Sequence, residues 1–278
     1  MKKFIFVLTT IVVFTAAPFV CADLAAEALA AVRRMEELGV KGDVATVYRD
    51  YFPKSYQNDI ESIVKAFAGK IDGEIFTNAV GLFAALAETG LAKPEYLDKF
   101  AKTAHVDLLP VKASEVDVFY NAMKKFAELF SYETLSKGDL NTIFTNPDFQ
   151  KMAAFLEKQS LRPEYTGSEL NQDGSVSITR LWHGRERTIK YKKTEGVWTD
   201  SDEYANWDED IKNTLRAISE IKIDDMTKKQ IINAIAETKQ ALSQAQKAEN
   251  IGRFYDILEK PVNRLIIVIV KSFTPDFS

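Results

Sequence analysis

The sequence is poor in the side chains that most often build active sites. It has one cysteine, Cys21, and two histidines, His105 and His183, in 278 residues. A Ser/His/Asp triad or a paired-histidine zinc motif needs a histidine at its centre, and neither histidine stands in such a spacing. Phosphate-loop, dinucleotide-binding and serine-hydrolase motifs are also absent from the sequence. We therefore expect no cofactor and no metal site, and the composition favours a protein that is not an enzyme.

The first 22 residues have the pattern of a cleavable export signal. Two lysines precede an apolar stretch, residues 4–14, that is too short to span a bilayer, and small residues follow it. Val20 and Ala22 occupy the positions at which signal peptidase prefers small side chains. We expect cleavage between Ala22 and Asp23, which makes the mature protein periplasmic or extracellular and suggests a bacterial source.

Cys21 leaves an alternative open. A cysteine near the end of an export signal can be lipidated and become the new N-terminus, which would tether the protein to a membrane. The residues before it, Pro18, Phe19 and Val20, match the usual leucine followed by two small residues poorly, so simple cleavage is the prediction. Cleavage leaves the mature chain without cysteine, which excludes disulfides and thiolate metal sites there.

The mature chain is acidic. Cleavage removes two lysines and no acidic residue, so the 36 basic residues fall to 34 against 40 acidic ones, a net charge of −6. We expect no nucleic-acid partner, because such binding needs a basic surface. The strongest apolar run after the signal, residues 265–270, is six residues long, so no membrane span is predicted in the mature chain.

The apolar pattern predicts a mainly helical protein with a small antiparallel β-meander. Apolar residues recur at three- and four-residue spacing in the region 23–160. Gly39, Gly69 and Gly90 are predicted to end helices, and Asn146 to begin one. The predicted helices of this region lie near 24–39, 60–69, 75–90, 114–130 and 146–156.

The pattern changes in the region 161–278. A loop over 161–174 is predicted to precede three strands, near 175–182, 188–193 and 197–199, with turns at 183–186 and 195–196. A helical hairpin of the segments 211–218 and 225–245 follows. The run 265–270, rich in β-branched residues, is predicted to be a buried strand that can join the meander, although so short a run leaves a buried helix open. Both regions are expected to pack as one unit.

Aromatic residues gather in the predicted meander and the turn after it, and they offer a candidate ligand site. Their rings can line a pocket for an apolar or sugar ligand, and two arginines in the neighbouring turn can hold an anion. Core packing between sheet and helices explains the same aromatic residues without a ligand. The candidate ligand-binding residues are Trp182, Trp198, Trp207, Tyr191, Arg185 and Arg187.

An acidic segment, residues 200–210, is the candidate for carboxylate chemistry. It can hold a divalent cation or supply an acid and a base. However, it precedes a predicted helix, where carboxylates are favoured by unpaired amide groups and by the helix dipole. We interpret the segment as a structural helix start.

Three functional hypotheses follow. The first is an exported, noncatalytic protein of the bacterial envelope or the extracellular space that binds an apolar ligand or a protein partner of the envelope. The second is a carboxylate-dependent hydrolase, with Asp208 as the residue to test. The third is a structural protein that forms oligomers through the apolar seam of the helix over 231–245.

Overall fold

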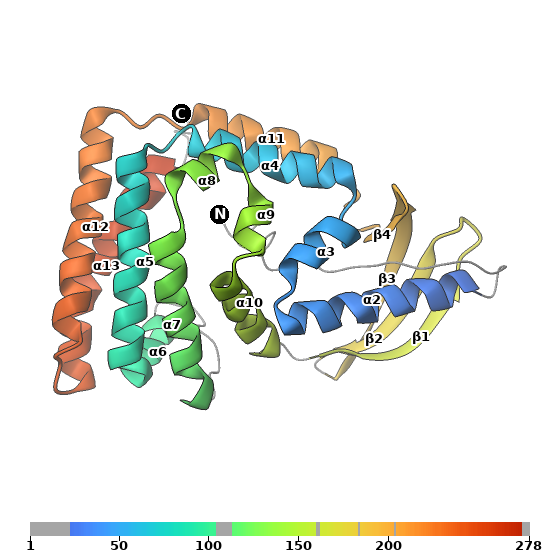
Figure 1. The fold of residues 1–278 in the computed structure, drawn as a ribbon, viewed down its shortest axis with the longest axis horizontal. Coiled ribbons are helices and arrows are strands. Elements are labelled where there is room, and N and C mark those ends of the chain that lie inside the picture. The colour runs from blue at the N-terminus through green and yellow to red at the C-terminus, as the bar shows by residue number, and fades with distance from the viewer. Residues whose placement is uncertain (1–22, 104–112, 160–161, 183, 203, 274–278) are drawn as a thin grey trace. The chain divides into compact units, whose positions relative to one another are not determined.

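Helices make up most of the computed structural model, which describes residues 23–103, 113–159, 162–182, 184–202 and 204–273. Four strands in these residues form one small antiparallel sheet (Figure 1). The predicted fold class, mainly α with a small β-meander, is therefore confirmed. The predicted export signal, Cys21 and both histidines lie outside the described residues.

The chain forms two compact units, each made from two separate stretches. The first, which we call the sheet unit, comprises residues up to Glu61 and Ala153–Ile211. The second, the helical unit, comprises Ser62–Met152 and the residues from Lys212 on. The boundaries fall within three helices, which are α4 (Lys54–Ala68), α10 (Pro147–Gln159) and α11 (Trp207–Glu220).

The sheet unit joins a helical layer to the sheet. Its helices include α2 (Asp23–Lys41) and α3 (Val44–Tyr51), and its strands are β1 (Glu164–Leu170), β2 (Val176–Trp182), β3 (Arg185–Thr194) and β4 (Val197–Asp200). The strands neighbour one another in chain order, and each is antiparallel to the next. α2 lies against β1 and β2, and α3 lies against β4 (Figure 1).

Part of one face of the sheet is buried, because successive side chains of a strand point to opposite faces of the sheet. Val176 and Ile178 of β2 are buried, and they stand directly opposite Tyr191 and Ile189 of β3. Helix α2 turns an apolar stripe inward at three- and four-residue spacing, as predicted, and each buried Val, Leu or Met side chain in it stabilises the fold by about 1.5–3 kcal/mol. The buried apolar residues of α2 are Ala28, Ala31, Val32, Met35 and Leu38.

Strand β1 lies where the sequence predicts a loop, so that prediction is wrong. Its sequence, EYTGSEL, is mostly polar, and the strand is largely exposed at the edge of the sheet, so no apolar alternation marks it. Its pairing with β2 shifts register between Tyr165 and Gly167. The turn predicted at 195–196 is confirmed, since Glu195 and Gly196 connect β3 to β4 with φ angles of 52° and 83°.

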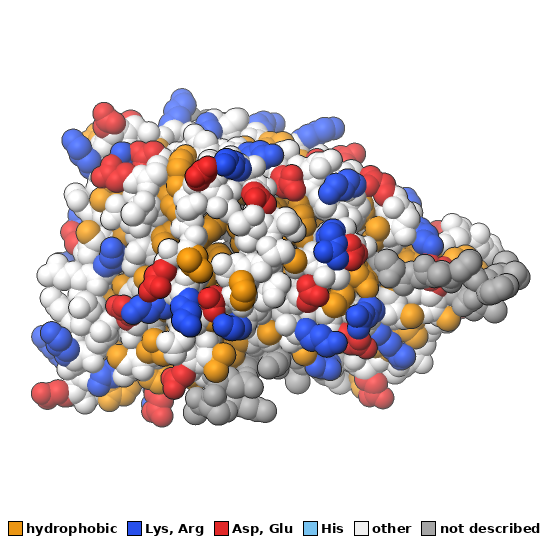
Figure 2. Space-filling model, in the orientation of Figure 1, with side chains coloured by type: hydrophobic (Ala, Val, Ile, Leu, Met, Phe, Trp, Pro, Cys, Tyr) orange, Lys and Arg blue, Asp and Glu red, His pale blue; other side chains and the backbone are white. Residues whose placement is uncertain are grey.

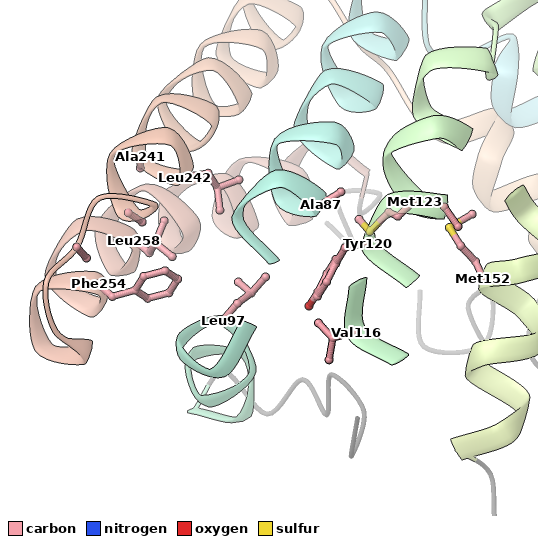
Figure 3. Close-up of a cluster of buried hydrophobic side chains, with 13 residues drawn as sticks. Ala87, Leu97, Val116, Tyr120, Met123, Met152, Ala241, Leu242, Phe254 and Leu258 are labelled. Carbon is pink, nitrogen blue, oxygen red and sulfur yellow. The ribbon is translucent and has the colours of Figure 1, made fainter. Parts of the chain in front are cut away.

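In the helical unit, α5 (Gly73–Ala92) lies between α7 (Ala113–Leu129) and α12 (Asp225–Ala245). The other helices that belong wholly to this unit are α6 (Pro94–Thr103), α8 (Tyr132–Lys137), α9 (Leu140–Phe144) and α13 (Ile251–Phe273). Figure 3 shows one buried cluster, to which α5, α6, α7, α12 and α13 contribute Ala87, Leu97, Tyr120, Leu242 and Phe254 respectively.

The C-terminal strand predicted at 265–270 is wrong, because this run belongs to helix α13. Leu265 is buried while Ile266 and Ile267 are exposed, which is a helical pattern. Packing along α12 overrides the β-branched composition. The predicted hairpin of 211–218 with 225–245 is also wrong, since α13 is the helix that packs along α12.

Two of the predicted helix ends are wrong for different reasons. Helix α2 continues past Gly39 to Lys41, and Gly42 follows with φ +75°. Gly90 lies inside α5 because the Tyr120 ring occupies the place of a side chain, with ring atoms 2.3 Å from where a Cβ would stand. The predicted start at Asn146 is confirmed, since its Oδ1 accepts the backbone N–H groups of residues 148 and 149.

Helix α5 is long and apolar enough to cross a membrane by length and composition alone. An 18-residue window in it has a mean hydropathy of 1.4, and 28% of that window is buried. Polar residues at 77–78 and 88–89 bound its longest stretch without a polar side chain, which is residues 79–87. The absence of a membrane span in the mature chain stays a prediction.

Candidate functional site

The structure places the six candidate residues in three different surroundings. Trp182, Arg185 and Arg187 lie together on β2 and β3, next to the turn that joins these strands. Trp198 and Tyr191 belong to the core of the sheet unit, and Trp207 begins α11. The six residues therefore do not line one common pocket.

Trp198 is part of a closed polar contact in the core. Its side chain is 1% exposed, and its indole N–H donates to Glu27 Oε1 over 3.1 Å. The same carboxylate oxygen accepts a hydrogen bond from Lys193 Nζ at 2.6 Å. The acid, the lysine and the indole thus satisfy one another, as buried polar groups must.

Trp207 belongs to an aromatic group within the sheet unit. Its ring centroid lies 4.5 Å from that of Tyr56 and 5.1 Å from that of Tyr204. The indole N–H donates to Asp59 Oδ2 over 2.8 Å. These contacts tie the start of α11 to the first turns of α4, which is a structural role.

The strand register brings a further arginine to the remaining candidates. Arg180 stands directly opposite Arg187, and Trp182 directly opposite Arg185, so all four side chains share one face of the sheet. The Arg180 guanidinium carbon lies 4.7 Å from the Trp182 ring centroid, and that of Arg187 lies 6.0 Å from it. We call these four residues the arginine–tryptophan cluster.

Sequence reasoning missed Arg180 because it assigned the turn to 183–186. In the structure β3 begins at Arg185, so the connection is only two residues long. A two-residue turn pairs residues that are equally distant from it. Counting outward from 183–184 would have placed Arg180 opposite Arg187.

The positive charges of the cluster are not balanced by ion pairs. Like charges directly opposite in a sheet are destabilising. Arg180 Nε is buried and has no hydrogen-bond partner among the described residues. The arginine ion pairs in the described part of the chain involve other residues, which are Arg34, Arg49, Arg216 and Arg264. The tryptophan ring attracts both guanidinium groups but brings no negative charge.

The carboxylate of Glu36 acts on Arg180 through its charge, but its hydrogen bond is with Tyr165. Tyr165, opposite Arg180 in the pairing of β1 with β2, donates its hydroxyl hydrogen bond to the carboxylate of Glu36 on α2. Burial raises the pKa of Glu36, while the Tyr165 hydrogen bond and the charge of Arg180 act in the opposite direction. Burial and the nearby Glu36 charge raise the pKa of Tyr165. Arg180 therefore has an acidic neighbour but no direct bond to it.

Basic side chains are visible around this part of the sheet unit. On the face in view, Figure 2 shows several Lys and Arg side chains over α2 and the neighbouring strands. Arg33 of α2 lies over the Tyr165 ring, with its guanidinium carbon 5.6 Å from the ring centroid. Both Arg185 and Arg187 are exposed, so the cluster is open to solvent.

The described part of the acidic segment has the geometry of a helix start. Asp208, Glu209 and Asp210 are exposed in the first turn of α11, where the helix dipole favours them. Asp200 accepts the backbone N–H of Asp202 over 2.9 Å. Within the described residues, no group of three or more His, Cys, Asp or Glu side chains can hold a metal ion.

A depression on the helical unit is a weaker candidate. It has a volume of about 390 Å³ and lies between α7 and α10. One of its two lysines, Lys151, already pairs with Asp148 over 2.8 Å. Its lining residues are Asp117, Val118, Asn121, Ala122, Lys125, Asp148 and Lys151. This mixed, partly paired lining points to no particular ligand.

The seam proposed for self-assembly is covered within the chain. Ile231, Ile235 and Leu242 of α12 are buried in clusters that also contain residues of α5 and α13. This face of α12 is therefore not open to a second copy.

Comparisons with protein-family models, with curated protein sequences and with solved structures found no match. The function must therefore be argued from the arginine–tryptophan cluster itself.

Proposed function

We propose that this protein is exported and binds an anionic partner through the arginine–tryptophan cluster, without catalysing a reaction. The observation that carries the proposal is the direct opposition of Arg180 and Arg187 beside Trp182, with Arg180 Nε buried and unpartnered among the described residues. An anion bound there would remove the repulsion between the two charges.

The energetics favour an anion over an apolar ligand at this site. Hydrogen bonds to charged groups stabilise a complex by about 1.5–3 kcal/mol each, and both exposed arginines have donors to offer. Two of the three tryptophans, Trp198 and Trp207, already direct their N–H groups to Glu27 and Asp59. The first hypothesis, an apolar ligand or an envelope protein, is thereby narrowed to a partner that carries negative charge.

The acidic net charge of the mature chain does not prevent such binding. At an ionic strength of about 0.1 M, charges on the surface are screened beyond about 10 Å. A partner at the cluster therefore responds mainly to the local arginines. The export signal pattern in residues 1–22 supports a location outside the cytoplasm.

The proposal can be tested with a defined acidic probe, poly-L-glutamate, titrated into the mature protein that begins at Asp23. The test variant is Arg185→Gln/Arg187→Gln, since both side chains are exposed and their replacement should leave the fold intact. The control is Arg216→Gln/Arg253→Gln, which makes the same charge change at exposed positions of the helical unit. Fluorescence anisotropy of labelled probe measures the affinity.

We expect the cluster variant to bind at least about tenfold more weakly than wild type, a loss of about 1.4 kcal/mol. The control variant should remain within about twofold of wild type. Equal losses in both variants would mean that net charge alone attracts the probe, and the site would be wrong.

The intact mass of the protein purified from its host tests export, because cleavage after Ala22 and lipidation of Cys21 give different masses.

A further inference from the structure

We infer that the group bound by the arginine–tryptophan cluster is a phosphate monoester, held as a dianion between the guanidinium groups of Arg180 and Arg187. The inference rests on the proposed function and names the chemistry of the partner's charged group. It depends on which donors the cluster leaves available and on how many charges it leaves unbalanced.

The donors are available because of how the arginines contact Trp182. A guanidinium group stacks on an aromatic ring through its flat face, which leaves the N–H groups along its rim free to bind an anion. The Arg180 carbon at 4.7 Å from the ring centroid fits this kind of contact. Its Nε–H is buried and unpartnered among the described residues, so the outer N–H groups of the guanidinium are the donors left for an anion. Arg187, on the neighbouring strand, offers a second rim.

Trp182 also reduces the entropy that binding must overcome. Free arginine side chains lose about 1.5–2 kcal/mol of rotamer freedom when they are fixed. Here one indole ring contacts two guanidinium groups from adjacent strands, so both are partly ordered before a ligand arrives. Preorganised donors of this kind favour planar, bidentate recognition of oxygen anions.

The charge balance points to a dianion. Arg180, Arg185 and Arg187 bring three positive charges to one face, and Glu36 brings at most one negative charge near Arg180. Glu157 and Arg162, which also act on Glu36, have opposite charges that offset each other. Two positive charges are therefore left. A carboxylate would neutralise one of them, whereas a phosphate monoester, with a second pKa near 6, carries close to two negative charges at neutral pH.

The test compares phenyl phosphate with benzoate, which share the ring and differ in the acidic group. Binding is followed by NMR through the indole N–H resonance of Trp182, which the variant Trp182→Phe identifies. At about pH 7.5, where the ester is a dianion, we expect phenyl phosphate to bind at least tenfold more tightly than benzoate. Sodium chloride at matched ionic strength is the control for screening.

Variants test whether phenyl phosphate binding depends on the paired arginines. Arg187→Gln should weaken phenyl phosphate binding at least tenfold, and Arg187→Lys should fall between wild type and Arg187→Gln, because lysine keeps the charge but not the forked donor. Arg216→Gln, at an exposed position in the helical unit, should leave the affinity unchanged. Arg187 is itself exposed, so its variants should fold.

Three outcomes would overturn the inference. They are equal affinities of benzoate and phenyl phosphate, a Trp182 shift that sodium chloride reproduces, and the lack of a saturable shift with phenyl phosphate. If phenyl phosphate fails while poly-L-glutamate still binds in an arginine-dependent manner, the phosphate inference is wrong and the proposed function stands. If neither probe depends on Arg185 and Arg187, both are wrong.

Discussion

Two tryptophans on the same face of the same sheet have different surroundings. Each lies beside a cation, since Lys193 Nζ is 5.5 Å from the Trp198 ring centroid and the Arg180 carbon is 4.7 Å from that of Trp182. Trp198 also donates a hydrogen bond to a carboxylate, that of Glu27. Trp182 lies beside a second cation, Arg187, whose guanidinium carbon is 6.0 Å from the ring centroid.

Helix α2 places two of its acids, Glu27 and Glu36, in different contacts. Glu27 and Glu36 are nine residues apart, so at 3.6 residues per turn they lie on opposite sides of the buried stripe of α2. Glu27 reaches Trp198, while Glu36 is held by Tyr165 of the edge strand β1. The comparison separates a contact closed within the chain, at Trp198, from one that we propose binds a partner, at Trp182.

The largest expected effect comes from removing each tryptophan in turn. Trp198→Ala should lower the free energy of unfolding by about 3–5 kcal/mol, because it opens a cavity in the core. Trp182→Ala should lower it by about 1–2 kcal/mol, because that ring is only partly buried. Urea denaturation measures both. Equal losses would show that Trp182 contributes as much to the free energy of unfolding as Trp198 does, which would contradict the difference between the two tryptophans.

The next effect concerns the acid that completes the Trp198 contact. Glu27→Ala removes the acceptor for both Lys193 and the indole N–H, and should cost about 2–3 kcal/mol in the free energy of unfolding. Glu37→Ala on the same helix is the control, since its ion pair with Arg34 is exposed and should contribute less than about 0.5 kcal/mol. A similar loss in both variants would contradict the role given to Glu27.

A third substitution supplies the acid that the cluster lacks. Arg187→Glu places a carboxylate opposite Arg180, and should raise the free energy of unfolding by about 0.5–1 kcal/mol while it abolishes phenyl phosphate binding. Lys192→Glu is the matched control, because its strand partner is the uncharged Thr199. If the control stabilises the protein equally, relief of repulsion between Arg180 and Arg187 is not the cause.

Much of the fold could be predicted because its signals are local. The stripe of α2 and the start at Asn146 follow from spacing and from single residue types. Strand β1 and helix α13 could not be predicted from such signals, because β1 is mostly polar and the run 265–270 is rich in β-branched residues. Tertiary packing determines the structure of both segments.

Only part of the candidate site could be predicted from the sequence, for a related reason. Trp182, Arg185 and Arg187 are close together in the chain and were identified there. Arg180 joins them through strand register, which a misplaced turn conceals. The core contact of Trp198 could not be predicted from local sequence either, because its indole N–H donates to Glu27, which is 171 positions away in the chain.

The smallest expected effect tests whether folding raises the pKa of Glu36, the acid near Arg180. Burial raises the pKa of Glu36 above its ordinary value of 4.5, so the folded protein holds this proton more firmly than the unfolded chain does. Through linkage, the contribution of Glu36 to stability falls as the pH rises from about 4.5 through the raised pKa.

Glu36→Gln removes this titration and keeps an acceptor for Tyr165, so its urea midpoint should fall less than that of wild type over the same pH range. Glu157, Arg162, Arg180 and Tyr165 also act on Glu36, but they are present in both proteins, and the difference between the two profiles isolates residue 36. Parallel profiles would mean that folding leaves the pKa of Glu36 unshifted. Diverging profiles would mean that folding raises the pKa of this carboxyl, as its burial predicts.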